Sequence, residues 1–375
     1  MPPTEFDRQM MLHALSLAKR GVGNVSPNPL VGCVVVSASG ELLGEGAHLV
    51  FGRPHAEPNA IADAEAHGHS VRGATVYVTL EPHSHQGKTP PCTTLLIEKE
   101  IARCVIAMED PNPTVSGKGI RELQKAGIQV EVGLLAQEAC ELNRFFVRHI
   151  TSGFPFVTVK LATSLDGRSA LAHGESKWIT SEASRKKVHE LRAEHDAVLI
   201  GARTARADDP ALTVRLAKGR QPKRIVLDAR LGLPPILKLF TDEERANTIL
   251  VTTAPAAEQN GKEFTRQGIE LLSIDASDDR INLSHLLRTL GARGIASVLV
   301  EAGPALAASF VRERLFDEIL LFYGPLFLGG DAKPMIGPLG IESLEQAPRL
   351  RLQRVERVEG TDDVMLRLRP EYSPS

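Results

Sequence analysis

The sequence predicts an α/β protein made of two domains. Its 375 residues exceed the usual size of a single domain. In both halves, short β-branched and apolar runs alternate with segments in which apolar residues recur at helical spacing. The segment 151–155, Thr-Ser-Gly-Phe-Pro, has the turn-forming residues typical of a boundary. We therefore expect one domain over residues 1–150 and a second over residues 151–375.

The first domain is expected to contain a mixed sheet covered by helices. Met11, Ala14 and Leu15 recur at helical spacing and predict an opening helix over residues 7–19. The patterns that follow predict strands at 30–37, 41–47, 74–80, 103–108 and 129–132, and helices at 55–66, 93–100, 119–126 and 136–150.

The second domain shows the same alternation and is also expected to be an α/β sheet. A long apolar run at 319–328 precedes a loop at Gly329-Gly330-Asp331. Further strands are expected at 156–162, 197–200, 224–227, 248–251 and 297–300.

Four side chains of the first domain have the chemistry of a catalytic zinc site. His55 and Glu57 open one expected helix, His83 follows a strand, and Cys92 begins another helix. Zinc prefers imidazole nitrogen and thiolate sulfur, and a catalytic site keeps one position for water. A hydrolytic nucleobase deaminase also needs a carboxylate that moves protons without binding the metal, which is the role expected of Glu57. The metal lowers the pKa of its water to about 7, so hydroxide is available at neutral pH.

The local structure expected around these residues suits their roles. Pro58 falls in the first turn of its helix, where proline is tolerated. The start of a helix favours a thiolate at Cys92. Cys33 lies in an apolar run and is expected to pack in the core rather than bind metal. Any one of the twelve histidines is more commonly structural, so the prediction depends on the joint pattern.

These segments resemble the bifunctional riboflavin-biosynthesis deaminase/reductase family, and the resemblance covers nearly the whole chain. It implies a cytidine-deaminase-like domain that uses Zn²⁺. It also implies that Asn28 holds the substrate near the metal and that His85 and Lys88 meet a ribose phosphate. The matching motifs are Pro27-Asn28-Pro29-Leu30-Val31-Gly32-Cys33, His55-Ala56-Glu57, Thr79-Leu80-Glu81-Pro82, Gly87-Lys88-Thr89-Pro90-Pro91-Cys92 and Asp110-Pro111-Asn112-Pro113.

One position departs from the family pattern. The family has a cysteine after Glu-Pro, where this chain has His83. A His/His/Cys set is still suitable zinc chemistry, and it removes one thiolate charge from the centre. His83 is the favoured third ligand, because the family also has a histidine at position 85 apart from its ligands. The alternative is that His85 binds the metal and His83 does not.

The C-terminal half resembles the reductase half of the same family, which has a dihydrofolate-reductase-like fold and uses NADPH. Thr163 is a mild departure, because the family commonly has methionine there. The matching runs are 159–167, 176–180, Arg192, 201–204, 208–215 and 300–304.

The resemblance also implies the reductase-site residues. Lys160 and Glu301 would lie beside the reacting sugar. The substrate would contact Ser176, Arg192, Leu212, Arg215 and Glu301, and the cofactor would contact Ala162, Trp178, Thr204, Asp208, Gly303, Pro304, Ala305, Leu306, Ala307, Ala308 and Ser309.

Two of these assignments have a physical basis in the sequence. Gly303 follows a strand and precedes a helix, and the free backbone N–H groups at a helix start attract phosphate. Arginine suits phosphate because its donors form a planar fork. Each of these residues also has a purely structural alternative: Gly303 could form an ordinary strand–helix turn, the arginines could be solvated surface residues, and Trp178 could fill the core.

Composition narrows the expected partners. The net charge is −2, the pI is about 6.7 and aromatic residues make up 4%, so neither nucleic acid nor an anionic membrane is favoured. The four cysteines show no paired framework, which fits a reducing compartment. Neither a signal peptide nor a membrane span is evident. We expect a cytoplasmic homo-oligomer, a dimer or tetramer, that acts on phosphorylated pyrimidine small molecules.

The expected function is therefore hydrolytic deamination of a phosphoribosylamino-pyrimidine, followed by NADPH-dependent reduction of its ribosyl group to ribityl. One alternative is a nucleoside deaminase that acts on RNA. A second is a working reductase joined to a deaminase-like module that the histidine at position 83 has silenced. Tight, salt-sensitive tRNA binding would favour the first alternative, and a folded protein without zinc would favour the second.

Overall fold

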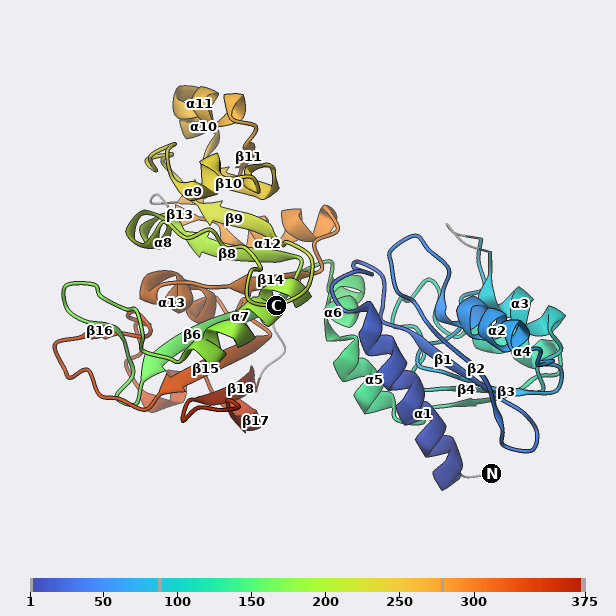
Figure 1. Cartoon of the computed structure of the whole chain (residues 1–375). Helices are drawn as coiled ribbons and strands as arrows, with labels where there is room; N and C mark the ends of the chain where they lie inside the picture. The colour runs from blue at the N-terminus through green and yellow to red at the C-terminus, as the bar shows by residue number, and fades with distance from the viewer. Residues whose placement is uncertain (1–2, 87–89, 278–279, 372–375) are drawn as a thin grey trace. The chain divides into compact units, whose positions relative to one another are not determined.

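The computed structural model describes residues 3–86, 90–277 and 280–371. The chain divides into two compact units, Met1–Gly153 and Phe154–Ser375, each built around its own sheet (Figure 1). Within the described residues, no helix combines the length and apolar character needed to cross a membrane.

The first unit is built on a five-stranded mixed sheet in the order β2-β1-β3-β4-β5. β1 pairs antiparallel with β2 and β3, whereas β3, β4 and β5 are parallel to one another. The strands are β1 (Gly32–Val36), β2 (Leu42–Ala47), β3 (Thr75–Val78), β4 (Arg103–Ile106) and β5 (Gln129–Val132). The helices are α1 (Glu5–Ala18), α2 (Ala56–Ala66), α3 (Cys92–Glu98), α4 (Lys118–Lys125), α5 (Ala136–Leu142) and α6 (Arg144–Ser152), with a 3-10 turn at Lys19–Gly21.

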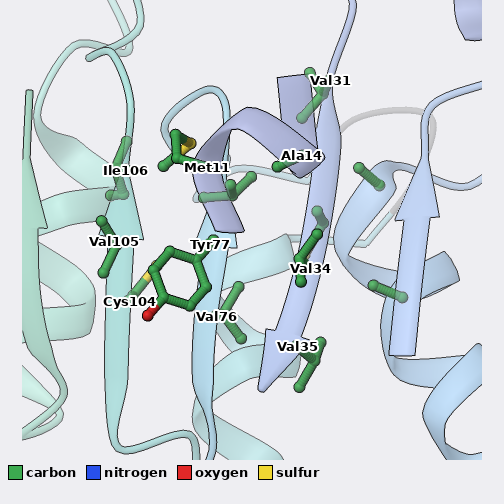
Figure 2. Packing of buried hydrophobic residues seen from close by; sticks show 14 of the residues in the cluster. Met11, Ala14, Val31, Val34, Val35, Val76, Tyr77, Cys104, Val105 and Ile106 are labelled. Atoms are coloured by element: carbon green, nitrogen blue, oxygen red, sulfur yellow. The ribbon is translucent and has the colours of Figure 1, made fainter. Parts of the chain in front are cut away.

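Helix α1 packs on one face of this sheet. Figure 2 shows Met11 and Ala14 lying over the strands, with Tyr77 beneath them. The Tyr77 hydroxyl donates a hydrogen bond of 2.7 Å to Asp7, which also accepts one from Arg103. This buried polar contact fixes the helix against β3 and β4.

Helix α2 lies unusually close to strand β2. A Cβ atom at Gly44 would come within 2.4 Å of the carbonyl oxygen of Ala60, and one at Gly46 within 2.4 Å of the Ala60 nitrogen. Only glycine therefore permits the contact between this strand and the helix backbone. The contact matters because His55 is the N-cap of α2 and Glu57 lies in its first turn.

The second unit is built on a nine-stranded sheet in the order β11-β10-β9-β8-β14-β6-β15-β18-β17. The strands from β11 to β15 in this order are parallel, and β18 and β17 add an antiparallel hairpin at the edge. The bounds are β6 (Phe156–Ser164), β8 (Ala197–Gly201), β9 (Lys223–Leu227), β10 (Thr248–Thr252), β11 (Glu270–Ser273), β14 (Ser297–Val300), β15 (Glu318–Gly324), β17 (Leu350–Arg357) and β18 (Val364–Pro370).

Helices cover both faces of this sheet. Leu199 belongs to one buried apolar cluster while its neighbours Val198 and Ile200 belong to the other, as expected for a strand buried on both sides. The main helices are α7 (Glu182–Glu194), α8 (Ala202–Asp208), α9 (Lys238–Thr241), α10 (Ala254–Asn260), α11 (Lys262–Arg266), α12 (Leu283–Ala292) and α13 (Pro304–Arg312). Short elements complete the unit: strands β7 (Arg168–Ala170), β12 (Ala276–Ser277), β13 (Arg280–Ile281) and β16 (Lys333–Pro334), and 3-10 turns at Arg245–Asn247 and Leu344–Gln346.

The predicted α/β class is confirmed, but two details differ from the sequence-based expectation. The single helix expected over 136–150 is two helices, because Asn143 interrupts it. The Asn143 side chain accepts a 2.7 Å hydrogen bond from the Leu30 nitrogen and donates one of 3.0 Å to the Leu30 carbonyl oxygen. The second difference is at the two edges of the larger sheet, where neither β11 nor the β17–β18 hairpin was predicted.

Candidate functional site

Three predicted ligands meet in the first unit. His55 is the N-cap of α2, His83 follows β3, and Cys92 is the first residue of α3. One ligand atom from each lies within 4.8 Å of the others. Cys92 Sγ is 3.6 Å from His55 Nδ1. Zinc bond lengths and tetrahedral angles require about 3.6 Å between a sulfur and a nitrogen ligand, so the spacing fits zinc.

Burial and neighbouring groups shift the pKa values of the ligands in this cluster. Burial, together with His83 and His48, lowers the pKa of His55 to about 4, so its ring is neutral and able to bind metal. Burial and the nearby Glu57 carboxylate raise the pKa of the Cys92 thiol. A divalent ion would reverse that preference, because it stabilises the thiolate directly.

Glu57 is the carboxylate next to the cluster. It is 3% exposed, and burial raises its pKa, opposed by hydrogen bonds from its own backbone and from Cys92. A buried carboxyl group with a raised pKa is suited to accept and return protons.

Asn28 and His48 form the polar wall of the same site. The Nδ1–H of His48 donates to the Pro54 carbonyl oxygen at 3.1 Å, so Nε2 is the acceptor for the Asn28 amide at 3.2 Å. Burial lowers the pKa of His48, which keeps the ring neutral in this arrangement. The contact turns the Asn28 NH₂ group towards His48. His48 was missed in the sequence analysis, because no motif contains it and only the folded pocket brings it next to Asn28.

A cavity of about 470 Å³ opens onto these residues. His85 lines this cavity. The centroid of its ring is 5.6 Å from that of the His83 ring, and the two ring planes are nearly perpendicular. His85 is outside the group of three close ligand atoms, and Lys88 lies outside the described residues. The remaining lining residues are Pro27, Pro29, Val31, Phe51, Gly52, Arg53, Leu80, Glu81, Asp110, Asn112, Val115, Phe146 and Ile150.

Glu81, in the Glu-Pro motif, organises a wall of this cavity. Its buried carboxylate accepts backbone hydrogen bonds from Asp110, Gly117, Gly119 and Ile120 at 2.9–3.3 Å. These bonds hold the segment that contains the Asp-Pro-Asn-Pro motif against the pocket.

The second unit has its own buried charged cluster, formed by Lys160 in the middle of β6, Glu301 directly after β14 and Arg192 on α7. Arg192 donates to both carboxylate oxygens of Glu301, at 2.5 and 2.9 Å. Burial opposes ionisation of Glu301, but Arg192, Lys160 and His189 together lower its pKa, so it stays ionised. Burial lowers the pKa of Lys160, with Glu301 opposing. The arrangement holds the Lys160 amine and the Glu301 carboxylate close together at a partly desolvated site.

Arg215 lies near this cluster. Its backbone nitrogen donates to His189 Nδ1 at 3.1 Å, and its side chain is exposed. His189 is on α7, one turn before Arg192, and burial with two nearby arginines lowers its pKa to about 4. His189 was also missed in the sequence analysis, because an isolated histidine on a helix has no distinguishing pattern.

Thr204 and the stretch 303–309, which belong to the expected cofactor site, lie together at the start of α13. Gly303 is its N-cap, and a Cβ added there would lie 3.4 Å from Thr204 Oγ1. A cavity of about 430 Å³ opens beside Ala305, Leu306 and Ser309. Of the others in that stretch, Pro304 is half-buried, and Ala307 and Ala308 are buried.

The remaining predicted residues are placed as follows. Trp178 is 72% exposed and stacks with Arg185 at 4.2 Å, so it is not core filler. Leu212 is 2% exposed, so its side chain is packed in the interior. Ala162 is half-buried on β6, and Ser176 and Asp208 are exposed.

The fold and the two clusters define a two-part enzyme, with a metal-dependent hydrolase site in one unit and a nucleotide-dependent oxidoreductase site in the other. Residues 4–108 match the family model for the cytidine and deoxycytidylate deaminase zinc-binding region. Residues 155–364 match the model for the RibD C-terminal domain.

Relatives that match over nearly the whole chain point to the same family. The chain is 43% identical to riboflavin biosynthesis protein RibD of Bacillus amyloliquefaciens over 355 residues, covering 94% of each. It is 40% identical to RibD of Escherichia coli K12 over 365 residues, covering 94% of this chain and 96% of that one. The solved structure of Acinetobacter baumannii RibD superposes with a TM-score of 0.87 at 39% identity, covering 98% of this chain and 99% of that one.

This chain belongs to the RibD family of riboflavin biosynthesis proteins. It is accordingly a bifunctional enzyme, a zinc deaminase joined to an NADPH-dependent reductase.

Proposed function

We propose that the first unit, Met1–Gly153, deaminates 2,5-diamino-6-(5-phosphoribosylamino)pyrimidin-4-one, and that the second, Phe154–Ser375, reduces the ribosyl group of the product to ribityl. The printed name of the Thermotoga maritima relative, a diaminohydroxyphosphoribosylaminopyrimidine deaminase/5-amino-6-(5-phosphoribosylamino)uracil reductase, supports these substrates. That protein is 38% identical to this chain, covers 97% of it and has a TM-score of 0.86.

The observation that carries the deaminase proposal is the convergence of His55, His83 and Cys92 beside Glu57. These three side chains would hold zinc, which supplies the Lewis acidity that makes water nucleophilic near neutral pH. Glu57 carries two protons in turn: it moves the first proton of the attacking water to the ring nitrogen, and then moves the remaining hydroxyl proton to the amine, which leaves as ammonia. Asn28, oriented by His48, holds the pyrimidine against this carboxylate.

In the second unit, NADPH would supply hydride to C1′ of the opened sugar. Gly303 to Ser309 at the start of α13, with Ala162, Trp178, Thr204 and Asp208, would hold the cofactor. Glu301 accepts a hydrogen bond from a sugar hydroxyl, and Lys160 donates the proton that the ring oxygen O4′ gains when the C1′–O4′ bond breaks.

The contacts of Arg192 modify the role that the resemblance implies for it. Its Nε and one terminal nitrogen are bonded to Glu301, and its other terminal nitrogen donates to Thr213. We therefore assign Arg192 mainly to orienting Glu301. Arg215 is the main residue that binds the phosphate, and Ser176 and the Leu212 backbone contact the same substrate.

Substitution of Glu57 by glutamine tests the deaminase half. Zinc binding should be retained and ammonia release should fall by orders of magnitude, because the proton carrier is lost while the ligands stay. Reduction of the already deaminated substrate should be unchanged. Loss of both activities would contradict two separate sites, and a folded wild-type protein without zinc would favour a silenced deaminase module.

A homo-oligomer and a cytoplasmic location stay predictions from the sequence. Light scattering of the purified protein measures the first, and fractionation of cells measures the second.

A further inference from the structure

The segment 209–215 is an irregular stretch between α8 and β9. Two of its residues have left-handed backbone conformations, Asp209 with φ of 38° and Leu212 with φ of 52°. The segment ends at Arg215, the proposed phosphate ligand. An irregular segment without partners for its backbone would sample many conformations, and ordering it would cost binding free energy.

Side chains from elsewhere bond to the backbone of this segment. Gln221 binds Val214 twice, accepting from its nitrogen at 2.7 Å and donating to its carbonyl oxygen at 3.0 Å. His189 accepts from the nitrogen of Arg215 at 3.1 Å. The Asp209 carboxylate in turn accepts from the nitrogen of Lys238 at 2.8 Å. Polar contacts therefore fix the segment near both of its ends.

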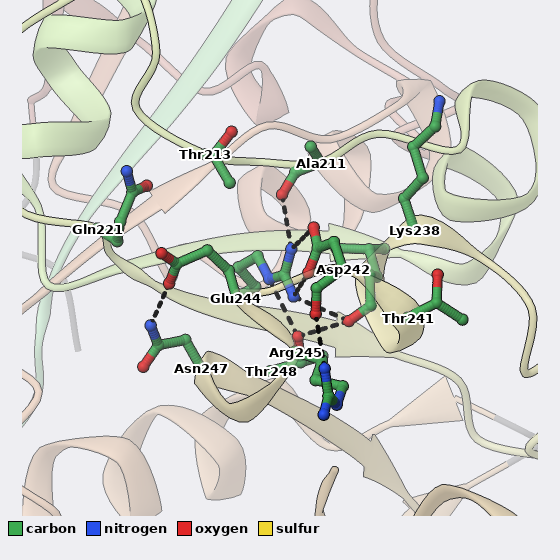
Figure 3. Close-up of polar contacts among 12 residues, drawn as sticks. Ala211, Thr213, Gln221, Lys238, Thr241, Asp242, Glu244, Arg245, Asn247 and Thr248 are labelled. Atoms are coloured by element: carbon green, nitrogen blue, oxygen red, sulfur yellow. Dashed lines mark hydrogen bonds and ion pairs between the residues drawn. The ribbon is translucent and has the colours of Figure 1, made fainter. Parts of the chain in front are cut away.

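Arg224 anchors the middle of the segment. It is 1% exposed on β9 and donates to the Ala211 carbonyl oxygen at 2.9 Å. The same guanidinium makes a two-pronged pair with Asp242 at 2.6 and 2.8 Å, and also donates to Thr248 and Leu239 (Figure 3). Because these bonds occupy Nε and both terminal nitrogens, the arginine is held rigidly and holds Ala211 in turn.

We propose that Gln221 and Arg224 are positioning residues of the reductase. They hold the backbone of 209–215 in one conformation. Arg215 can then bind the substrate phosphate without loss of binding free energy to ordering of the segment. The inference rests on the proposed reduction of a phosphorylated sugar in this unit. Since the phosphate does not react, its binding contributes equally to the ground state and the transition state, so the clamp acts on KM more than on kcat.

Gln221→Ala is the direct test, because it removes both bonds to Val214 without changing charge. We expect KM for the deaminated substrate to rise about tenfold, as the loss of one or two hydrogen bonds predicts, with kcat changed by less than about twofold. The dissociation constant for NADPH should be unchanged. Hydrogen exchange at the Val214 amide should become faster, which reports loosening of the segment itself.

Two further variants separate positioning from a general loss of stability. Gln221→Glu keeps the acceptor for the Val214 nitrogen but loses the donor, so its KM should lie between wild type and Gln221→Ala. Arg224→Lys keeps the charge opposite Asp242 but not the fork, and should also raise KM. Arg245→Ala is the matched control, since Arg245 contacts the Asp242 carbonyl oxygen in the same network (Figure 3) but not the segment.

The inference is overturned if Val214 exchanges faster in Gln221→Ala while KM stays at the wild-type value. It is also overturned if Arg245→Ala raises KM as much as Gln221→Ala does, because the effect would then be nonspecific. A wild-type protein that fails to reduce the substrate would instead refute the proposed function, so the two failures are distinguishable.

Discussion

Replacing Gly46 by alanine should damage the metal centre without touching a ligand. Gly46 is on β2, and a Cβ there would lie 2.4 Å from the Ala60 nitrogen and 2.6 Å from the Ala56 carbonyl oxygen. Both atoms belong to the backbone of α2, which cannot rotate away as a flexible side chain can. The helix must therefore move as a body.

The size of that movement follows from the distances. Ordinary contact begins near 3.4 Å, so α2 must withdraw by roughly 1 Å. Overpacking of this kind costs about 1–3 kcal/mol of stability. His55 and Glu57 move with the helix, whereas zinc sites tolerate only about 0.2 Å in ligand distance. A misplacement of about 1 Å also lowers the rate of an oriented reaction about 100-fold.

The assay is zinc affinity by competition with a chelator, together with ammonia release at saturating zinc. Gly46→Ala should bind zinc more weakly and deaminate about 100-fold more slowly, while reduction by the same chain is unaffected. Gly330→Ala is the matched control, since a Cβ there meets nothing within 4 Å. Wild-type zinc affinity and deamination in Gly46→Ala would refute the reasoning that close packing of α2 on β2 sets the ligand geometry.

Two further predictions concern charge pairs. Arg192→Lys should lower kcat/KM of the reductase by about 10- to 100-fold, because lysine cannot reproduce the two-pronged bond to Glu301. Steady-state kinetics of the reduction measures this effect, and the deamination rate of the same variant should stay at the wild-type value. Asp7 is held ionised by hydrogen bonds from Arg103, Thr4 and Tyr77 that outweigh its burial, so its pKa lies well below the usual range. The stability it contributes is therefore present above about pH 4 and lost as the pH falls further. Calorimetry should find Asp7→Asn less stable than wild type by about 2 kcal/mol at pH 7, with the difference shrinking in acid; a difference independent of pH would contradict this assignment.

The sequence predicted much of the fold because both halves have strong local patterns. Strand 129–132 was expected with the bounds that the structure has, since β-branched residues alternate there and Gly127 and Gly133 flank it. The α5–α6 break could not be predicted from local periodicity. It depends on Asn143 bonding to Leu30, which is 113 residues away in the chain.

The candidate metal site was predictable because three ligands and a carboxylate lie in short, distinctive motifs. The supporting residues were not. His48 and Gln221 act through hydrogen bonds to backbone and side-chain atoms that only the tertiary structure brings near them. Whether position 83 or position 85 supplies the third ligand was also open in the sequence, and the structure brings His83 to His55 and Cys92.

Metal content measured alongside ammonia release tests the central claim most directly. The account predicts one zinc per chain in wild type, and loss of both zinc and deamination in His83→Ala with reduction intact. His85→Ala should keep its zinc. Zinc and ammonia release that persist in His83→Ala, or that disappear only in His85→Ala, would contradict the claim that His55, His83 and Cys92 form the metal centre.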